Sequence, residues 1–174
     1  YVGNYIAPGS QPPVHTPSPN LLFRGGGDGT FTDVTTPVVA GGGTALATAW
    51  TDFDADGDVD LMLANDFGAF VEPNQIYRND GFAPAGWGFT ECASAWHADL
   101  GLYCMGIGVG DYDRDGDFDY YFTNLGRNAF LRNDGARFTD VTTSTGTDET
   151  FDPSTAPPLF ATSWGTGMHD FDND

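Results

Sequence analysis

The sequence predicts an all-β fold, a β-propeller fragment of about three four-stranded blades. Three observations support this prediction. An Asp-rich loop recurs at a constant interval, and the same strand-like segments recur with it. The 24 glycines and 11 prolines are spread along all 174 residues, as expected for many short strands and turns. Hydrophobic residues make up 40% of the chain, which is enough for a packed core.

The Asp-rich loops begin at positions 52, 111 and 170, so that consecutive loops start 59 residues apart. In the two complete copies, residues 52–60 and 111–119, aspartate occupies positions 1, 3, 5, 7 and 9, and glycine occupies position 6. The third copy, residues 170–174, is incomplete because it lacks both the glycine and the last aspartate. Clustered carboxylates around a glycine turn are typical of a loop that surrounds one hard cation with oxygen ligands.

Four carboxylates that converge within ~5 Å repel one another by roughly 3 kcal/mol per pair at an effective dielectric constant of about 20. A divalent cation, proton uptake or an open loop would relieve this repulsion. Gly57 and Gly116 can take the positive φ of a sharp turn, and Val59 and Phe118 are expected to anchor the loop exits in the core. Position 7 is expected to offer its backbone carbonyl. We therefore predict that the loops bind Ca²⁺. The predicted ligands are the loop aspartates Asp52, Asp54, Asp56, Asp58, Asp60, Asp111, Asp113, Asp115, Asp117, Asp119, Asp170, Asp172 and Asp174.

Two other calcium motifs are excluded. An EF-hand needs a bidentate Glu at position 12 between two helices, but Leu63 and Phe122 occupy that position within strand-like segments. The nonapeptide of parallel β-helices repeats every nine residues rather than every 59. The remaining alternative is an acidic turn that is solvated by water and binds no metal.

The strand before each Asp-rich loop alternates small and larger residues. The small positions are Ala45, Ala47 and Ala49, then Gly106, Gly108 and Gly110, then Gly165 and Gly167. Small residues weaken an ordinary strand, so they indicate the close approach of another backbone, as among innermost strands around a central axis.

Further strands recur after each loop. One set covers residues 20–25, 74–79 and 128–133, and another covers residues 29–35, 88–93 and 137–142. Hairpin turns are predicted between these sets, at residues 26–29, 79–81 and 133–135. Each repeat thus holds four strands. A two-layer sandwich is the alternative, but it does not explain why the loop always follows the same strand.

These repeats set the predicted boundaries. We predict a partial blade over residues 1–51, blades over 45–104 and 105–163, and the start of a further blade over 164–174. The first residues, 1–4, match residues 121–124, and the chain begins without Met or a signal peptide. We therefore expect an internal fragment of a longer protein, with the remaining propeller blades elsewhere in the full-length chain.

Composition excludes two classes of partner. The formal net charge is −19, with no Lys and only six scattered Arg, so nucleic acid is not expected as a ligand. No run of 18 apolar residues is present, so no membrane span is predicted.

The pattern Asn-x-apolar-apolar-Arg-Asn-Asp-Gly, then Phe-Thr-Asp-Val-Thr, then residues 105–119 resembles the FG-GAP/VCBS repeats of integrin-α-like propellers. Residues 105–119 and 164–174 are also similar to the cartilage acidic protein family, whose propeller often carries an ASPIC/UnbV segment. The resemblance implies a seven-bladed ring, extracellular calcium sites between first and second strands, and binding rather than catalysis.

A partner surface is predicted on the face opposite the calcium loops. The long proline-rich loops lie there, at residues 6–20 and 144–161, and such loops are usually functional or linkers. Aromatic and histidine side chains in or near the variable loops would suit a protein or carbohydrate ligand, or would instead cap the core between blades. They are Phe67, Phe70, Trp87, Trp96 and His97. By contrast, Trp50 and Trp164 lie on repeated strands and are expected in the core.

Cys92 and Cys104 are predicted to form a disulfide worth roughly 3 kcal/mol, with two free buried cysteines as the alternative. An even cysteine count in an acidic chain favours an extracellular, periplasmic or cell-surface location. The recurring Arg24, Arg78 and Arg132 are expected to pair with acidic or carbonyl oxygens between strands in every blade. The three histidines, His15, His97 and His169, are too far apart in sequence to indicate a metal site.

The function that these features favour is a calcium-binding extracellular recognition or adhesion module without catalysis. One alternative is the propeller portion of a secreted polysaccharide lyase, which would need a Lys, Arg or His base beside a metal. Another is a purely structural repeat.

Overall fold

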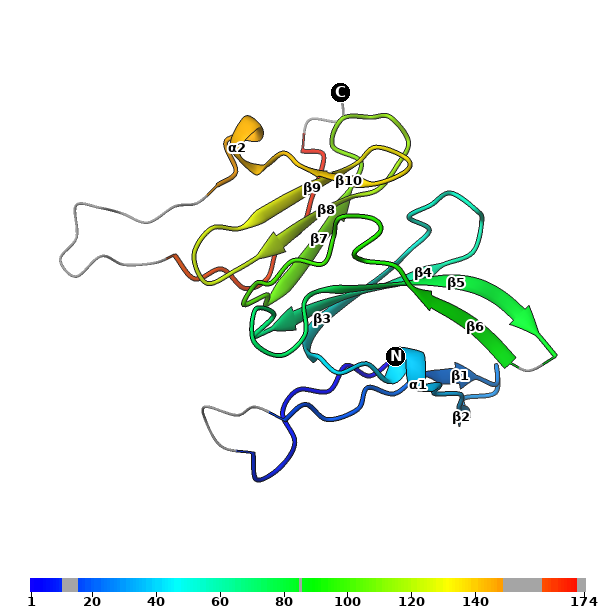
Figure 1. The fold of residues 1–174 in the computed structure, drawn as a ribbon. Coiled ribbons are helices and arrows are strands. Elements are labelled where there is room, and N and C mark those ends of the chain that lie inside the picture. The colour runs from blue at the N-terminus through cyan, green and yellow to red at the C-terminus, as the bar shows by residue number, and fades with distance from the viewer. Residues whose placement is uncertain (11–15, 85, 149–160, 172–174) are drawn as a thin grey trace.

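The computed structural model describes residues 1–10, 16–84, 86–148 and 161–171. This part of the chain is all-β, with antiparallel sheets and two helices of four residues each (Figure 1). Several residues named above lie outside the described ranges: His15, Asp172 and Asp174, together with part of each proline-rich loop. Within the described ranges, no helix has the length and apolar character needed to cross a bilayer.

Two four-stranded sheets form the centre of the molecule, and in each the strands follow one another in chain order. The first sheet contains β3 (Thr44–Thr51), β4 (Asp60–Asp66), β5 (Gln75–Ala83) and β6 (Gly86–Glu91). The second contains β7 (Gly106–Gly110), β8 (Asp119–Thr123), β9 (Ala129–Asn133) and β10 (Phe138–Asp140). We call these sheets repeat 2 and repeat 3. The predicted four antiparallel strands per repeat are confirmed for both.

Repeat 1 comprises the residues before β3. Its hairpin pairs β1 (Phe23–Gly25) with β2 (Phe31–Asp33). An isolated antiparallel bridge pairs Val2 with Leu21, which places the chain at Val2 where the preceding strand of the repeat would lie. The short helix α1 (Pro37–Ala40) follows, with Pro at its first turn and the Thr36 side chain accepting from the Val39 N–H. Repeat 3 is likewise followed by α2 (Thr142–Thr145).

The same asparagine pair closes each repeat. A backbone N–H at the end of the second strand donates to an asparagine side chain that precedes the third strand, at 2.7–2.9 Å. The pairs are Asn4 with Asn20, Asn65 with Asn74 and Asn124 with Asn128. The carbonyl of the first asparagine of each pair then accepts from the next repeat. The donors are the backbone N–H groups of Ala45, Cys104 and Ser163. Successive repeats are therefore joined by one recurring bond.

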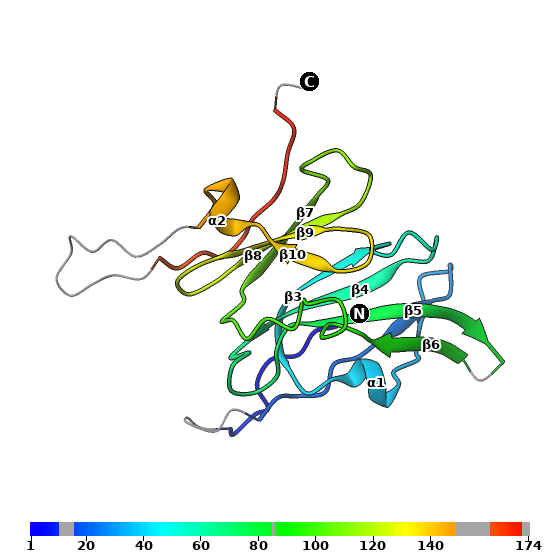
Figure 2. The same ribbon diagram turned by 45° about the horizontal axis from the view of Figure 1, so that its top comes forward.

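The small residues of the first strands allow close packing, as predicted. A Cβ added to Gly106 would lie 2.2 Å from the Trp164 carbonyl oxygen, and one on Gly110 would lie 2.8 Å from Met168. Residues 164–168 accordingly run alongside β7 (Figure 2). The hydroxyl of Thr123 donates to the Trp164 carbonyl at 2.6 Å, which fixes this segment against repeat 3.

Two apolar clusters hold the repeats together. The larger lies between repeats 2 and 3 and contains Phe53, Met62, Ile76, Tyr120, Phe122, Leu131 and Phe138. The smaller lies between repeats 1 and 2 and contains Leu22, Val39, Leu61, Leu63 and Tyr77. Each fully buried side chain of this size contributes about 1.5–3 kcal/mol.

Three expectations about buried and turn residues are wrong. Trp50 is 42% exposed because it faces repeat 1 across an open groove, and Trp164 is 61% exposed because its backbone, not its ring, packs on β7. Residues 79–81 do not form the hairpin turn. They lie within β5, where the register shifts between Asn79 and Phe82, and the hairpin closes between Ala83 and Gly86.

The predicted disulfide is absent, because Cys92 and Cys104 are free thiols in the structure. The Sγ atom of Cys92 lies 3.7 Å from the Ile76 carbonyl, and that of Cys104 lies 3.7 Å from the Gly106 carbonyl. Both cysteines contribute to the apolar cluster between repeats 2 and 3. They therefore act as small apolar residues there.

Candidate metal centre

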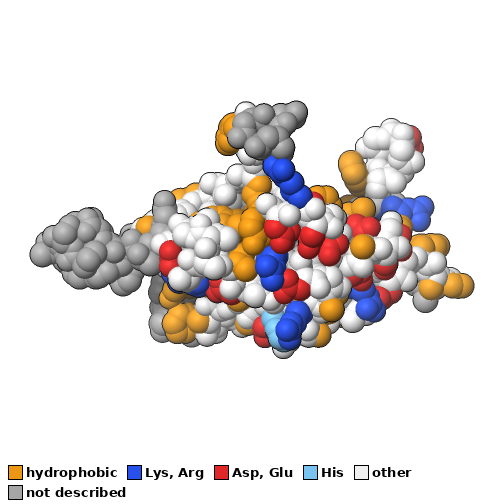
Figure 3. All heavy atoms as spheres, turned by 90° about the horizontal axis from the view of Figure 1, so that it is seen from above, with side chains coloured by type: hydrophobic (Ala, Val, Ile, Leu, Met, Phe, Trp, Pro, Cys, Tyr) orange, Lys and Arg blue, Asp and Glu red, His pale blue; other side chains and the backbone are white. Residues whose placement is uncertain are grey.

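The two complete Asp-rich loops connect first and second strands. Residues 52–60 join β3 to β4 and residues 111–119 join β7 to β8, and neither loop is helical. Leu63 and Phe122, at position 12, lie in strands β4 and β8, so the exclusion of an EF-hand is confirmed. Both loops rise on the same side of the sheets (Figure 1), and acidic side chains gather on that side beside arginine (Figure 3).

The first aspartate of each loop organises the turn. The Asp52 carboxylate accepts the Asp56 N–H at 3.1 Å and the Gly57 N–H at 3.0 Å. In the second loop, Asp111 accepts the corresponding N–H groups at the same distances. The aspartate at position 5 of each loop also accepts the N–H of position 7. The two loops therefore share one hydrogen-bonded frame.

Two positions in each loop take the left-handed conformation. Gly57 and Gly116 have φ of 96° and 100°, as the sequence predicts. Ala55 and Arg114, at position 4, have φ of 57° and 63°. A residue with a Cβ in this region costs roughly 1–2 kcal/mol. Sequence reasoning missed position 4, since neither Ala nor Arg signals a left-handed turn.

The last aspartate of each loop is buried and joins the loop to the third strand. Asp60 accepts the Phe53 N–H at 3.1 Å and the Asn79 N–H at 2.7 Å. Asp119 makes the equivalent pair of bonds, with the N–H groups of Tyr112 and Asn133. Position 9 thus closes both loops, and in the first loop Asp60 also belongs to the group of clustered carboxylates.

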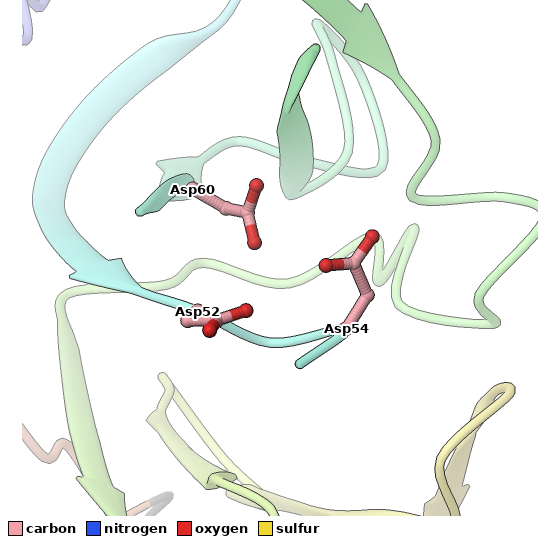
Figure 4. A group of neighbouring side chains, drawn as sticks. All are labelled: Asp52, Asp54 and Asp60. Carbon is pink, nitrogen blue, oxygen red and sulfur yellow. The ribbon is translucent and has the colours of Figure 1, made fainter. Parts of the chain in front are cut away.

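Each loop brings three carboxylates together. In the first loop, oxygen atoms of Asp52, Asp54 and Asp60 all lie within 4.8 Å of one another, and the three side chains face a common space (Figure 4). In the second loop the clustered carboxylates are Asp111, Asp113 and Asp115, at positions 1, 3 and 5, whereas those of the first loop stand at positions 1, 3 and 9. Each group could hold a metal ion. Other predicted ligands in the described part lie outside these two groups. They are Asp56, Asp58, Asp117, Asp119 and Asp170.

The charges in the first group favour a bound cation. Burial and the nearby Asp56 and Asp52 carboxylates raise the pKa of Asp54, and burial raises the pKa of Asp60 to about 6. Two carboxylates at such a separation repel by about 3 kcal/mol at an effective dielectric constant of about 20. The Oδ1 atom of Asp54 is buried and has no hydrogen-bond partner among the described residues. A cation would satisfy this oxygen and offset the repulsion.

The residue that anchors the first loop is not the predicted one. Val59 and Phe118, at position 8, are 49% and 42% exposed, so they do not enter the core. Phe53, at position 2, is 2% exposed and meets the Trp96 ring edge-on, with ring centroids 4.6 Å apart. The Asn133 side chain of repeat 3 donates to the Phe53 carbonyl at 2.7 Å. The loop of repeat 2 therefore anchors against repeat 3.

The recurring arginines pair with acidic oxygens in repeats 2 and 3, but with an aspartate two residues further along the chain and not between strands. Arg78 lies 2.7 Å from Asp80, and Arg132 lies 2.7 Å from Asp134. Both pairs are exposed to solvent, which screens the attraction, so they contribute little to stability. The equivalent Arg24 is followed two residues later by Gly26, and the described residues contain no ion pair with it.

The variable-loop aromatic residues divide into two groups. Trp96 packs in the core, and Trp87 lies in β6, so neither belongs to an opposite-face surface. Phe67 and Phe70 follow β4, at the end of the sheet away from the Asp-rich loop, and Phe70 is 76% exposed. Both rings contact Tyr103, with centroids 5.6 and 6.2 Å apart. His97 is exposed and has a φ of 58°.

A family model for the FG-GAP-like repeat matches residues 13–63 and again residues 52–122. Each match extends from one repeat through the Asp-rich loop of the next. The chain belongs to the FG-GAP-like repeat family. The ends of the two matches, at residues 63 and 122, differ by 59 positions, which is the spacing of the loops. No curated protein matches this FG-GAP-like chain.

Proposed function

We propose that this FG-GAP-like protein is a calcium-binding, non-catalytic recognition or adhesion module that acts outside the cytoplasm. The observation that carries the proposal is the pair of carboxylate groups, Asp52, Asp54 and Asp60 in one loop and Asp111, Asp113 and Asp115 in the other. The two loops share one hydrogen-bonded frame, and positions 1 and 3 contribute to both groups. Each loop brings like charges together, and a cation bound in each loop is the simplest explanation.

Calcium suits these loops better than magnesium or a transition metal. The donors in both groups are carboxylate oxygens, with no His or Cys. Calcium accepts six to eight oxygen ligands in flexible geometry, whereas magnesium demands a near-ideal octahedron and keeps several waters. The backbone carbonyl at position 7 is the expected additional ligand. Filling the sites would also reduce the net charge of a very acidic chain.

A propeller accounts for the recurring packing of the repeats. Two four-stranded sheets and the hairpin of repeat 1 follow one another with the same asparagine pairs and the same joining bond. Three repeats are fewer than the 4 to 8 blades of a closed ring, so further repeats are needed. We propose that the protein belongs to the cartilage acidic protein subgroup of this family.

The recognition surface that we propose is the aromatic patch opposite the calcium loops. It consists of Tyr5, Phe67, Phe70 and Tyr103, which form a continuous series of ring contacts. Tyr5 is held by a 2.6 Å hydrogen bond from its hydroxyl to Asp66. Exposed aromatic rings bind sugar faces and protein side chains at low entropic cost, so a carbohydrate or protein ligand fits this patch.

Thermal unfolding with calcium, magnesium or chelator tests the metal part of this proposal. Calcium at 100 times its Kd should stabilise the protein by about 2.7 kcal/mol per site, and magnesium at equal concentration by much less. Unchanged melting in calcium and chelator would contradict it. Binding to glycan and matrix-protein arrays tests the recognition part, and Phe70→Ala should weaken it. Release of unsaturated ends from uronic-acid polymers would contradict the non-catalytic part.

A further inference from the structure

Phe53 is linked to all three clustered carboxylates of the first loop. Asp52 precedes it and Asp54 follows it in the chain. Its backbone N–H donates to the third carboxylate, that of Asp60, at 3.1 Å. Figure 4 shows these three carboxylates around a common space, which we call the first metal site. The position of the Phe53 backbone therefore determines how the three side chains meet.

The ring of Phe53 is held by aromatic residues of the interface with repeat 3. Its centroid lies 4.6 Å from that of Trp96, in the connection between β6 and β7, and 6.3 Å from that of Phe138, in β10. Trp96 and Phe138 also hold each other. Their ring centroids are 5.7 Å apart, and the Phe138 N–H donates to the Trp96 carbonyl at 2.9 Å. The ring thus enters a socket that is itself fixed.

A hydrogen bond from repeat 3 holds the backbone of Phe53. The side-chain NH₂ group of Asn133, in β9, donates to the Phe53 carbonyl at 2.7 Å. Asn133 is completely buried, its N–H donates to Asp119 at 2.9 Å, and its side-chain carbonyl accepts the Gly135 N–H at 3.0 Å. The amide cannot turn away from Phe53 without leaving buried polar groups unpaired, which is costly.

The residue before the loop is tied to repeat 3 as well. The Thr51 hydroxyl forms a hydrogen bond with the hydroxyl of Tyr120, which lies in β8 and is completely buried. Asp52 follows Thr51 directly. Repeat 3 therefore contacts the start of the loop through a hydroxyl, an amide and an aromatic socket, and each contact is made within one residue of Asp52.

We propose that Phe53 and Asn133 are positioning residues of the first metal site, an inference that rests on the calcium binding proposed above. Neither side chain is a ligand, because the ring is packed and the amide is already hydrogen-bonded. They hold the backbone so that the Asp52 and Asp54 carboxylates face Asp60, whereas free like charges would turn apart towards water. Repeat 3 thus raises the calcium affinity of a loop in repeat 2. By linkage, bound calcium strengthens the packing of these two repeats by the same factor.

Calorimetric titration of the whole chain with calcium tests this inference. All variants carry Asp113→Asn, which leaves the first metal site as the one under measurement. The test variants are Phe53→Ala, Phe53→Leu and Asn133→Ala. Phe122→Ala is the matched control, since Phe122 is equally buried in the apolar cluster between repeats 2 and 3 but lies in β8 and not in a loop. Circular dichroism verifies that each variant is folded before titration.

Phe53→Ala and Asn133→Ala should each raise the calcium Kd about tenfold, the lower end of the effect of removing a group that orients a metal ligand. Phe53→Leu should retain most of the affinity, because a leucine side chain still fills much of the socket. Phe122→Ala should leave the Kd unchanged, although it removes as large a buried ring.

Two results would overturn the inference while the calcium function stands: a parent that binds calcium no more tightly than Phe53→Ala and Asn133→Ala, or a control that loses as much affinity as they do. A parent that binds no calcium at the first metal site would overturn the proposed function there, and this inference with it.

Discussion

Replacing Phe53 by Ala should destabilise the protein far more than the same change at Tyr112, although both residues occupy position 2 of an Asp-rich loop. Phe53 is 2% exposed and packs against Trp96 and Phe138, whereas Tyr112 is 38% exposed. Truncating a buried Phe costs about 3–5 kcal/mol through lost transfer energy and the cavity left behind. The ring of Tyr112 contacts Phe130, so its loss should cost about 1 kcal/mol.

Urea denaturation followed by tryptophan fluorescence measures both changes. For a chain of this length, the Phe53→Ala change corresponds to a melting temperature lower by about 10 °C. The difference between variants should persist in chelator, because it arises from packing between repeats 2 and 3 and not from the metal. Equal losses at the two positions would refute the assignment of Phe53 as the anchor between repeats.

Three further predictions follow from the packing. Gly106→Ala should cost about 1–3 kcal/mol in urea denaturation because its Cβ would meet a backbone carbonyl, whereas Gly165→Ala, with open space around it, should cost less than about 0.5 kcal/mol. Asn74→Ala should cost about 1–3 kcal/mol, since it leaves the buried Asn65 N–H without an acceptor; a loss as small as that of Gly165→Ala would contradict the role of the asparagine pair. Burial raises the pKa of the Cys92 thiol to about 11 and that of the Cys104 thiol to about 12. At pH 8 both should therefore react with a thiol reagent only after denaturation. A mass without reductant that is lower by two hydrogen atoms would show a disulfide and disprove the free thiols.

Local sequence signals were sufficient for the repeated elements. Clustered aspartates and glycine identified the loops, and the stripe of Gly and Ala correctly indicated a close backbone approach at Gly106. These predictions succeeded because they depend on residue chemistry within one repeat. The asparagine pairs were missed as a structural device, although asparagine visibly begins each third strand, because their partners lie across loops of different length.

Burial between repeats could not be predicted in the same way. Val59 and Phe53 are both apolar residues of one loop, and only the position of repeat 3 decides that Phe53 enters the core. Trp50 lies on a repeated strand but faces a groove rather than a filled interface. The left-handed turn at Ala55 depends on the hydrogen bonds that Asp52 imposes. Tertiary neighbours, rather than local propensity, determine these features.

Calcium titration by calorimetry, with Asp54→Asn, Asp113→Asn and the double variant, tests the central claim most directly. The substitutions keep the side-chain shape and remove one carboxylate from each group. The wild type should bind two calcium ions within the described loops, each single variant should lose one of them, and the double variant should lose both. Asp54→Asn should also melt higher than the wild type in chelator, because it removes a partly buried charge that lies among other carboxylates. Undiminished calcium binding by the double variant would contradict the assignment of these loops as the metal sites.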